Sequence, residues 1–346
     1  MNRCDKLREL MAENEAVYIS SYPNIFYYSG FTSEDARLII TKSRQILLTD
    51  SRYTVQAHLQ SPEFELYDII SDREKVIKSL GAELLCFEEE HITVSGFSAL
   101  QKYGIKLKPF SKTISVLRQV KDDEEIKKIS EAERLGDEAF GYITERIKAG
   151  RSEREVALEL EFYMKKNGAA SLSFETICAS GVRSAMPHGV ASDKLIEAGD
   201  FVTLDFGCIL DGYCSDMTRT VVVGKASDRQ REIYEVVLTA QRAALAVLKE
   251  GLTCADGDRA AREVIEQAGY AKFFGHSTGH SVGIEIHENP NLSPKSKDIL
   301  KAGNIVTVEP GIYIEDFGGV RIEDLVQITS QGIVNLTNSE KELLII

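Results

Sequence analysis

The segment FVTLDFGCILDGYCSDMTRTVVV, residues 201–223, contains two strand-like runs on either side of a turn signal. The turn signal is Asp211-Gly212, a pair favoured in two-residue β-hairpin turns because the turn needs positive φ angles. Apolar residues such as Val202 and Leu204 crowd the runs, so both faces are expected to be partly buried. The segment therefore predicts a partly buried antiparallel hairpin.

The turn also sets the register of this hairpin. If Leu210 faces Tyr213, then Asp205 pairs with Thr218. Asp216 then becomes the diagonal neighbour of Asp205 on the same sheet face. Diagonal neighbours are roughly 7–8 Å apart at the backbone, close enough for two carboxylates to bind one cation. The alternative is two solvated aspartates, but the apolar surroundings favour burial, where charges need partners or a metal.

Four of the six histidines fall within one hundred residues, in segments rich in glycine or bearing proline. Loops of this kind carry function more often than packing. Glycines on both sides of His280 allow close backbone approach there, as a residue directed into a crowded site requires. The four candidates are His188, His276, His280 and His287. We interpret His58 and His91 as structural.

Two glutamates are further candidates for a metal site. Glu309 ends the apolar run IVTV and is followed by Pro310-Gly311, so the strand is expected to break just after it. Glu323 lies among apolar neighbours in VRIEDLVQI, with Arg321 on the same strand face. An ion pair with Arg321 would also explain Glu323, so the metal-site interpretation depends on the combination of candidates.

The length and pattern of the chain predict two domains. At 346 residues, 43% of them hydrophobic, it exceeds the usual size of a single domain. Its beginning alternates an amphipathic helix with strand-like runs at AVYIS, ARLIITKS, QILLT and AELLCF, an α/β pattern. A strongly charged helix starts at KDDEEIKK. We place the domains at residues 1–118 and 119–346.

The second domain is predicted to be α+β. Helices are expected at residues 126–147, 152–168, 227–251 and 256–269, where apolar periodicity meets capping or glycine stop signals. The strand-like runs FVTLDFGCIL, YCSDMTRTVVV, NIVTVEPGIYI and VRIEDLVQIT do not alternate strictly with these helices. This order favours an antiparallel-rich sheet over repeated βαβ units.

Composition argues against several classes of partner. Asp and Glu number 54 against 41 Lys and Arg, and the formal charge of −13 would repel a nucleic-acid backbone. No run approaches the roughly 18 apolar residues of a membrane span, and MNRCDKLREL lacks the apolar stretch of a signal peptide. The six cysteines form no CxxC pair and are expected to be reduced and mostly structural. We expect a cytoplasmic protein.

Four motifs together resemble the pita-bread metallopeptidases, the family of methionine aminopeptidase, aminopeptidase P, prolidase and creatinase. They are LDFGCILDGYCSDMTRT, GHSVGIEIHENP, VEPGIYI and GGVRIED, in the order and spacing of that family. The resemblance covers nearly the whole chain. It implies a smaller creatinase-like N-terminal domain followed by a pita-bread catalytic domain.

The resemblance also implies a centre of two divalent metal ions. By motif position, Asp205 would bind one metal, and His280 and Glu309 would complete the second. Asp216 and Glu323 would bridge both. Four carboxylates and one imidazole suit Mn²⁺, our first choice, better than a thiolate zinc site would; Co²⁺, Zn²⁺ and Fe²⁺ stay open.

Roles for the remaining candidates follow from the same resemblance. Two cations a few ångströms apart can lower the pKa of a bridging water and polarise the amide carbonyl that it attacks. We expect Glu309 to handle the proton of that water, His287 or the metals to stabilise the oxyanion and His188 to contact the scissile amide. We place His276 and Arg321 at the substrate or next to the metal ligands.

The large N-terminal domain resembles the proline-directed branch of the family. Our first expectation is an Xaa-Pro aminopeptidase acting on short peptides with proline in the second position. The alternative is an Xaa-Pro dipeptidase, which must grip a free carboxylate, for example with Arg321, Arg183 or Arg52. A non-catalytic protein-binding relative or a creatinase-like C–N hydrolase is less favoured, because such relatives lack ligands that are all present here. The resemblance also implies a homodimer.

Overall fold

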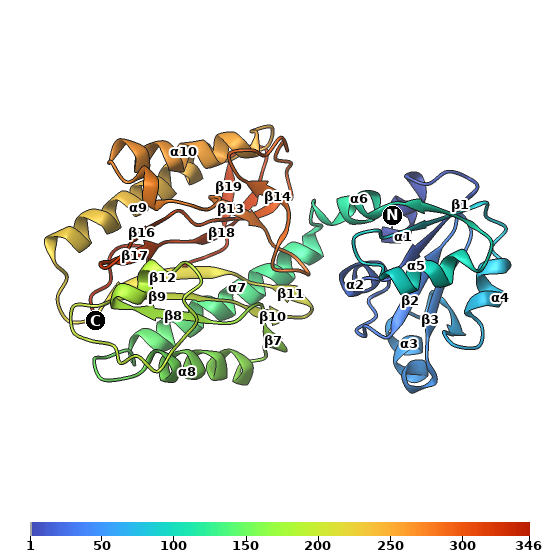
Figure 1. Ribbon diagram of the computed structural model, residues 1–346, viewed down its shortest axis with the longest axis horizontal. Coiled ribbons are helices and arrows are strands. Elements are labelled where there is room, and N and C mark those ends of the chain that lie inside the picture. The colour runs from blue at the N-terminus through green and yellow to red at the C-terminus, as the bar shows by residue number, and fades with distance from the viewer. Residues whose placement is uncertain (1) are drawn as a thin grey trace. The chain divides into compact units, whose positions relative to one another are not determined.

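The computed structural model describes residues 2–346, which divide into two compact units between Arg118 and Gln119. Each unit has its own sheets and helices (Figure 1). The α+β class and the order of a smaller α/β unit before a larger unit agree with the sequence. The larger unit contains every residue proposed above as a metal ligand.

The smaller unit is built on a six-stranded mixed sheet in the order β4-β3-β2-β1-β5-β6. The central strand β1 is buried along its whole length, as a strand covered on both faces should be. The predicted strand-like runs form β1, β2, β3 and β5. The strands are β1 (Glu15–Ile19), β2 (Ala36–Ile40), β3 (Gln45–Thr49), β4 (Glu65–Asp68), β5 (Leu84–Phe87) and β6 (Lys106–Pro109). The helices include α1 (Arg3–Glu9), α2 (Tyr22–Ser29), α3 (Thr54–Gln60), α4 (Arg73–Lys78), α5 (Val94–Gln101) and α6 (Ser111–Ser115).

Four long helices of the larger unit lie where the sequence predicts them. They are α7 (Asp123–Thr144), α8 (Glu153–Lys166), α9 (Asp228–Val247) and α10 (Cys254–Gln267). Ser152 and Glu155 form the predicted capping box at the start of α8. Helix α7 begins within the charged run KDDEEIKK, as predicted, after a capping box formed by Asp122 and Glu125. Helix α10 begins slightly earlier than expected because Thr253 caps it.

Antiparallel sheets fill the centre of the larger unit between two helical layers (Figure 1). Helices α7 and α8 share a hydrophobic core with β8–β9–β12, and α9 and α10 share another with the sheet β14-β13-β15-β18-β19. The strands are β7 (Ser171–Leu172), β8 (Ile177–Ser180), β9 (Phe201–Phe206), β10 (Cys208–Leu210), β11 (Tyr213–Cys214), β12 (Met217–Val222), β13 (Gly279–Ser281), β14 (Glu288–Leu292), β15 (Ile305–Val308), β16 (Gly311–Ile314), β17 (Gly318–Arg321), β18 (Asp324–Ile328) and β19 (Ile333–Asn335).

The hairpin of residues 201–223 has the predicted register and an unforeseen kink. Leu210 pairs with Tyr213, and Asp205 pairs with Thr218. Each arm is interrupted, so that β9 and β12 join one sheet while β10 and β11 join another. The interruption occurs at Gly207, where a Cβ atom would lie 1.9 Å from the carbonyl oxygen of Ser215. The kink thus leaves Asp216 outside the strands, directly before β12.

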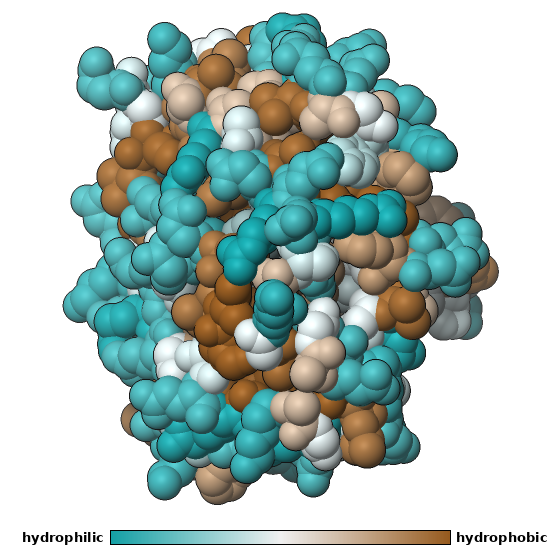
Figure 2. Space-filling model, turned by 90° about the vertical axis from the view of Figure 1, so that its left-hand side faces the viewer, coloured by the Kyte–Doolittle hydropathy of each residue, from teal (hydrophilic) through white to brown (hydrophobic). Residues whose placement is uncertain are grey.

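The surface and the cysteines agree with a globular protein. The face shown in Figure 2 is largely hydrophilic, with hydrophobic patches between the polar side chains, which is ordinary for a protein surface. All six cysteines are buried and unpaired. Across residues 2–346, no helix combines the length and the hydropathy that crossing a membrane requires.

Candidate metal centre

One pocket of about 800 Å³ in the larger unit collects the candidates found in the sequence. All five predicted metal ligands line it, and so do the four candidate histidines and Arg321. Each ligand comes from its own strand or strand end: Asp205 from β9, Asp216 before β12, His280 from β13, Glu309 after β15 and Glu323 between β17 and β18. The sheet that contains β9 and β12 and the sheet that contains β13, β15 and β18 therefore bring together ligands that are distant in sequence.

The donor atoms lie close enough to share cations. One ligand atom from each of Asp216, His280 and Glu323 lies within 4.8 Å of the other two. The Nε2 atom of His280 is 3.4 Å from Asp216 Oδ2 and 3.5 Å from Glu309 Oε1. Ligands that bind one ion at about 2.0–2.3 Å are separated by distances of this order.

The electrostatics of the site call for positive charge. Burial, and next the neighbouring carboxylates, raise the pKa values of Asp216 and Glu323 well above the usual range. Burial likewise raises the pKa of Glu309 to about 8. In addition, the buried Oδ1 atom of Asp205 has no hydrogen-bond partner in the described part of the chain. Crowded acids and an unpaired buried oxygen are both stabilised by a bound cation, so the residues fit a metal.

His280 is prepared to act as a neutral ligand. Burial, and next the adjacent His287, lower the pKa of His280 to about 4, so its contacts with Asp216 and Glu309 are not ion pairs at neutral pH. Its Nδ1 atom lies 3.2 Å from the carbonyl oxygen of Ser281. Because a carbonyl only accepts, Nδ1 carries the proton and the lone pair of Nε2 faces the carboxylates.

Arg321 pairs with Asp205 rather than with Glu323, the partner left open by the sequence. Its Nη2 atom donates to Asp205 Oδ2 at 2.6 Å, and its Nε atom donates to the hydroxyl of Thr218 at 3.0 Å. That hydroxyl in turn donates to Glu323 Oε2 at 2.7 Å. Arg321 thus orients two of the predicted ligands, one directly and one through Thr218.

The other two candidate arginines have different partners. Arg183 pairs with the buried Glu153 through its Nε atom, at 3.0 Å. Arg52 belongs to the smaller unit and pairs with Asp50 and Asp35. Neither contributes to the lining of this pocket, so among the three only Arg321 does.

His276 joins the same network through a tyrosine. Its Nδ1 atom is 2.8 Å from the carbonyl oxygen of Ser277, and its Nε2 atom is 2.9 Å from the hydroxyl of Tyr313. Burial lowers the pKa of His276 to about 4, so the ring is neutral and Nε2 accepts from Tyr313. The Tyr313 hydroxyl accepts from Arg321 Nη1 at 2.7 Å. Tyr313 and Arg321 thus connect His276 to Asp205.

His188 and His287 lie at the exposed mouth of the pocket. The ring of His287 approaches the ring of His280, with 4.4 Å between centroids and an interplanar angle of 67°. Their exposure leaves both imidazoles accessible to a substrate. Part of the lining around them is apolar and comes from Phe174, Ile177, Pro187, Val190 and Ile286.

Sequence reasoning missed several residues of the site. Tyr313 stands in the quoted motif VEPGIYI, and Thr218 was placed opposite Asp205 by the hairpin register, so both carried a signal that was not used. Thr307 accepts from the His280 amide and donates to Glu309 Oε1 at 3.2 Å. The apolar lining residues Phe174 and Ile177 gave no signal in sequence.

Comparisons with known proteins identify the family of the chain. Residues 127–330 match the model of metallopeptidase family M24, and residues 3–120 match the creatinase/prolidase N-terminal domain. The chain is 42% identical to an Xaa-Pro dipeptidase of Pyrococcus furiosus, with 99% of each chain covered. Its structure resembles that of an Xaa-Pro dipeptidase from Bacillus anthracis, with a TM-score of 0.97, 45% identity and 99% of each chain covered. It also resembles an X-Pro aminopeptidase from Thermotoga maritima, with a TM-score of 0.93, 39% identity and 100% of each chain covered.

Proposed function

The chain belongs to metallopeptidase family M24 and is a hydrolase that uses divalent metal, and we propose that it is an Xaa-Pro dipeptidase with a two-metal centre. The observation that carries this proposal is the set of five donor residues that line one partly apolar pocket. Ligand atoms of three of them, Asp216, His280 and Glu323, lie within 4.8 Å of one another. Full-length relatives named Xaa-Pro dipeptidase support the dipeptidase alternative better than the aminopeptidase expected first.

In this proposal the donors divide between two cations. Asp205, Asp216, His280, Glu309 and Glu323 are the side chains that would hold these cations. The unpaired Asp205 Oδ1 and the neutral His280 support this assignment. A donor set of four carboxylates and one imidazole favours Mn²⁺ as the ion, with Co²⁺, Zn²⁺ and Fe²⁺ as the competitors in the assay below.

The chain supplies groups for each part of the reaction. Two bound divalent cations supply a water of lowered pKa and polarise the scissile carbonyl. Glu309, which is partly exposed to the pocket beside His280, accepts the proton of the attacking water. His287 donates to the oxygen that becomes negative in the transition state, and His188 contacts the scissile amide.

The substrate pocket suits a small peptide with an apolar residue next to the cleaved bond. The apolar side chains of Phe174, Ile177 and Val190 offer a surface for a proline ring. Arg321 is engaged by Asp205 and Tyr313, so it acts on the substrate through the ligands that it orients rather than as a free carboxylate clamp. The homodimer expected from the family resemblance is part of this proposal, and light scattering of the full chain tests it.

A peptide panel tests the activity. Metal-depleted enzyme is reloaded with Mn²⁺, Co²⁺, Zn²⁺ or Fe²⁺ and given Xaa-Pro dipeptides, Xaa-Pro-Xaa tripeptides and matched Xaa-Ala dipeptides. We expect cleavage of the Xaa-Pro dipeptides with the highest rate in Mn²⁺. Faster cleavage of the tripeptides than of the dipeptides would contradict the dipeptidase proposal and indicate an aminopeptidase. No cleavage and no bound metal would indicate a binding protein.

A further inference from the structure

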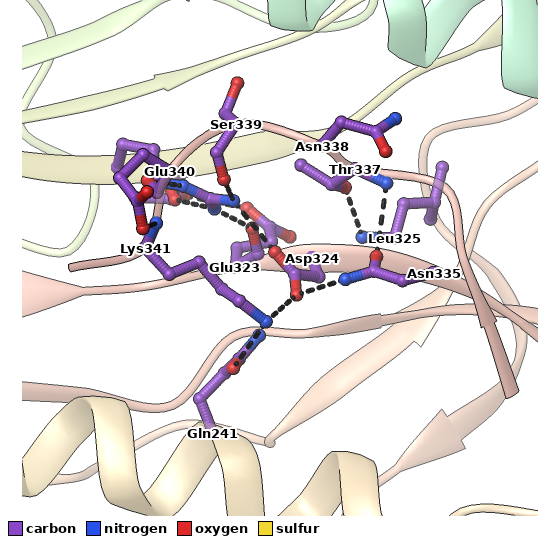
Figure 3. Close-up of polar contacts among 12 residues, drawn as sticks. Gln241, Glu323, Asp324, Leu325, Asn335, Thr337, Asn338, Ser339, Glu340 and Lys341 are labelled. Carbon is purple, nitrogen blue, oxygen red and sulfur yellow. Dashed lines mark hydrogen bonds and ion pairs between the residues drawn. The ribbon is translucent and has the colours of Figure 1, made fainter.

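We propose that the segment Thr337–Lys341, which we call the C-terminal clamp, positions the bridging carboxylates Asp216 and Glu323 for metal binding. This role rests on the proposed metal binding by those two residues. The clamp follows β19 and lies outside the pocket lining. Figure 3 shows its polar contacts with the start of β18.

The need for such a clamp follows from where the two carboxylates stand. Asp216 precedes β12, and Glu323 lies between β17 and β18, so both are outside the strands as defined. The backbone amide of Glu323 donates to the carbonyl oxygen of Thr218 in the hairpin, at 3.1 Å. Residues at strand ends lack the ladder of bonds that fixes strand interiors, so their positions depend on other contacts.

Towards Asp216, the clamp acts through a buried glutamate of α7. The hydroxyl of Thr337 donates to Glu133 Oε1 at 2.5 Å, and Glu133 Oε2 accepts from the backbone amide of Asp216 at 3.2 Å. Glu133 is completely buried and does not line the pocket. One carboxylate therefore connects the clamp to the backbone of a proposed metal ligand.

A second carboxylate of α7 fixes the clamp itself. Asp137 lies one turn after Glu133 on the same helix face. It accepts from the backbone amides of Asn338 and Ser339, the latter at 2.7 Å, and from the Ser339 hydroxyl at 2.6 Å. The clamp is thus fastened to α7 next to the bond that reaches Asp216.

Towards Glu323, the clamp acts through Arg219 of β12. Arg219 is completely enclosed and donates to the carbonyl oxygens of Ser339 and Glu340, at 2.8 and 2.9 Å. The same guanidinium also donates to the carbonyl oxygen of Glu323 and to Asp324 Oδ1, the latter at 2.9 Å. One side chain therefore joins the clamp to the backbone of the second bridging residue.

Lys341 completes this connection at Asp324 (Figure 3). Its Nζ atom is 2.7 Å from Asp324 Oδ2, which also accepts from the side-chain Nδ2 atom of Asn335 at 2.8 Å. Glu323 and Asp324 are adjacent in the chain. The side chain of Glu323 lines the pocket, whereas that of Asp324 contacts the clamp. A shift of Asp324 therefore displaces Glu323.

Two pairs of variants test the clamp by calorimetric titration of metal-free full-length protein with Mn²⁺. Thr337→Val keeps the shape but removes the hydroxyl, whereas Thr337→Ser keeps the hydroxyl. Lys341→Met removes the ammonium that binds the buried Asp324, whereas Arg242→Met removes an ion pair with the exposed Glu342 beside the clamp. Substitutions around metal ligands typically weaken metal binding about 10- to 100-fold.

We expect Thr337→Val and Lys341→Met to weaken Mn²⁺ binding about 10-fold or more, while Thr337→Ser and Arg242→Met stay near wild type. At subsaturating Mn²⁺, the kcat of Thr337→Val and of Lys341→Met should fall and should recover with excess metal, while the KM for the peptide is unchanged. Lower Tm with wild-type Mn²⁺ affinity in both variants would show a merely structural segment and overturn the proposal. If either Thr337→Val or Lys341→Met does not fold, the Mn²⁺ affinity of the other variant tests the proposal. A wild-type protein that binds no Mn²⁺ would instead refute the proposed function.

Discussion

At the scale of single residues, Asp205 has two distinct tasks. Its Oδ2 atom accepts a hydrogen bond from Arg321 at 2.6 Å, while its buried Oδ1 atom has no partner among residues 2–346. An unpaired buried carboxylate oxygen is costly, and a bound cation removes that cost. The same side chain thus belongs both to the structural network and to the proposed metal site.

Asp205→Asn separates these two tasks. The amide can still accept from Arg321, so the far-UV circular dichroism should be unchanged, while the lost charge should reduce bound metal. We expect kcat at saturating Mn²⁺ to fall by about 100-fold or more, because a metal supplies several kcal/mol of transition-state stabilisation. Elemental analysis gives the metal content. Asp193→Asn, which alters an exposed partner of Arg154, is the control, and a wild-type rate in Asp205→Asn would refute the assignment.

Arg321→Lys tests the three-way contact of the guanidinium. A lysine cannot reach Asp205, Tyr313 and Thr218 together, so buried groups would lose their partner. We expect about 1–3 kcal/mol of lost stability per unsatisfied group in urea unfolding. Arg154→Lys at an exposed pair should change stability by less than about 1 kcal/mol. Equal effects of the two substitutions would contradict the importance of this network.

At the scale of elements, the kinked hairpin determines where Asp216 lies. The two arms approach so closely at Gly207 that only glycine fits against Ser215. The turn itself follows local rules, since Asp211 and Gly212 have φ angles of 49° and 82°. The kink, in contrast, arises because each arm joins two different sheets.

Gly207→Ala should therefore damage both fold and site. The added Cβ atom would lie 1.9 Å from the Ser215 carbonyl oxygen and would push apart the arms that carry Asp205 and Asp216. We expect a loss of about 3 kcal/mol or more in chemical unfolding of the metal-free protein, together with weaker Mn²⁺ binding. Gly141→Ala in α7, where the added Cβ atom would meet nothing within 4 Å beyond the helix's own neighbouring residues, should instead stabilise by about 0.5–1 kcal/mol. A Gly207→Ala protein as stable as wild type would disprove the close approach.

At the scale of the whole molecule, metal removal should affect the two units differently. All proposed ligands lie after residue 118, and several of them are acids whose pKa values burial raises. Calorimetric unfolding of the full chain with Mn²⁺ or with a chelator should shift the transition of the larger unit. A free ion at a thousand times its Kd stabilises by about 4 kcal/mol per site.

The transition of the smaller unit should stay in place in the same experiment. Glu323→Gln is the matched control, because it removes a proposed bridging charge and should reduce the shift caused by Mn²⁺. Unfolding that is independent of Mn²⁺ would contradict the metal centre. Circular dichroism is a suitable second probe, since the chain has no tryptophan for fluorescence.

The sequence by itself determined the local features. The Asp211-Gly212 turn gave the register that pairs Asp205 with Thr218, and the Ser152 cap gave the start of α8. These are contacts between neighbours in the chain, so local rules suffice. Family motifs, rather than local physics, pointed to His280, Glu309 and Glu323.

Only the tertiary structure decided which distant groups meet. It gave Arg321 the partner Asp205 rather than Glu323, joined His276 to Tyr313, and attached Thr337 to Glu133. None of these pairings follows from periodicity or turn chemistry, because each joins segments that the packing of helices and sheets brings together. The donors of the proposed metal centre were therefore present in the sequence, whereas the contacts that hold them depend on the whole larger unit.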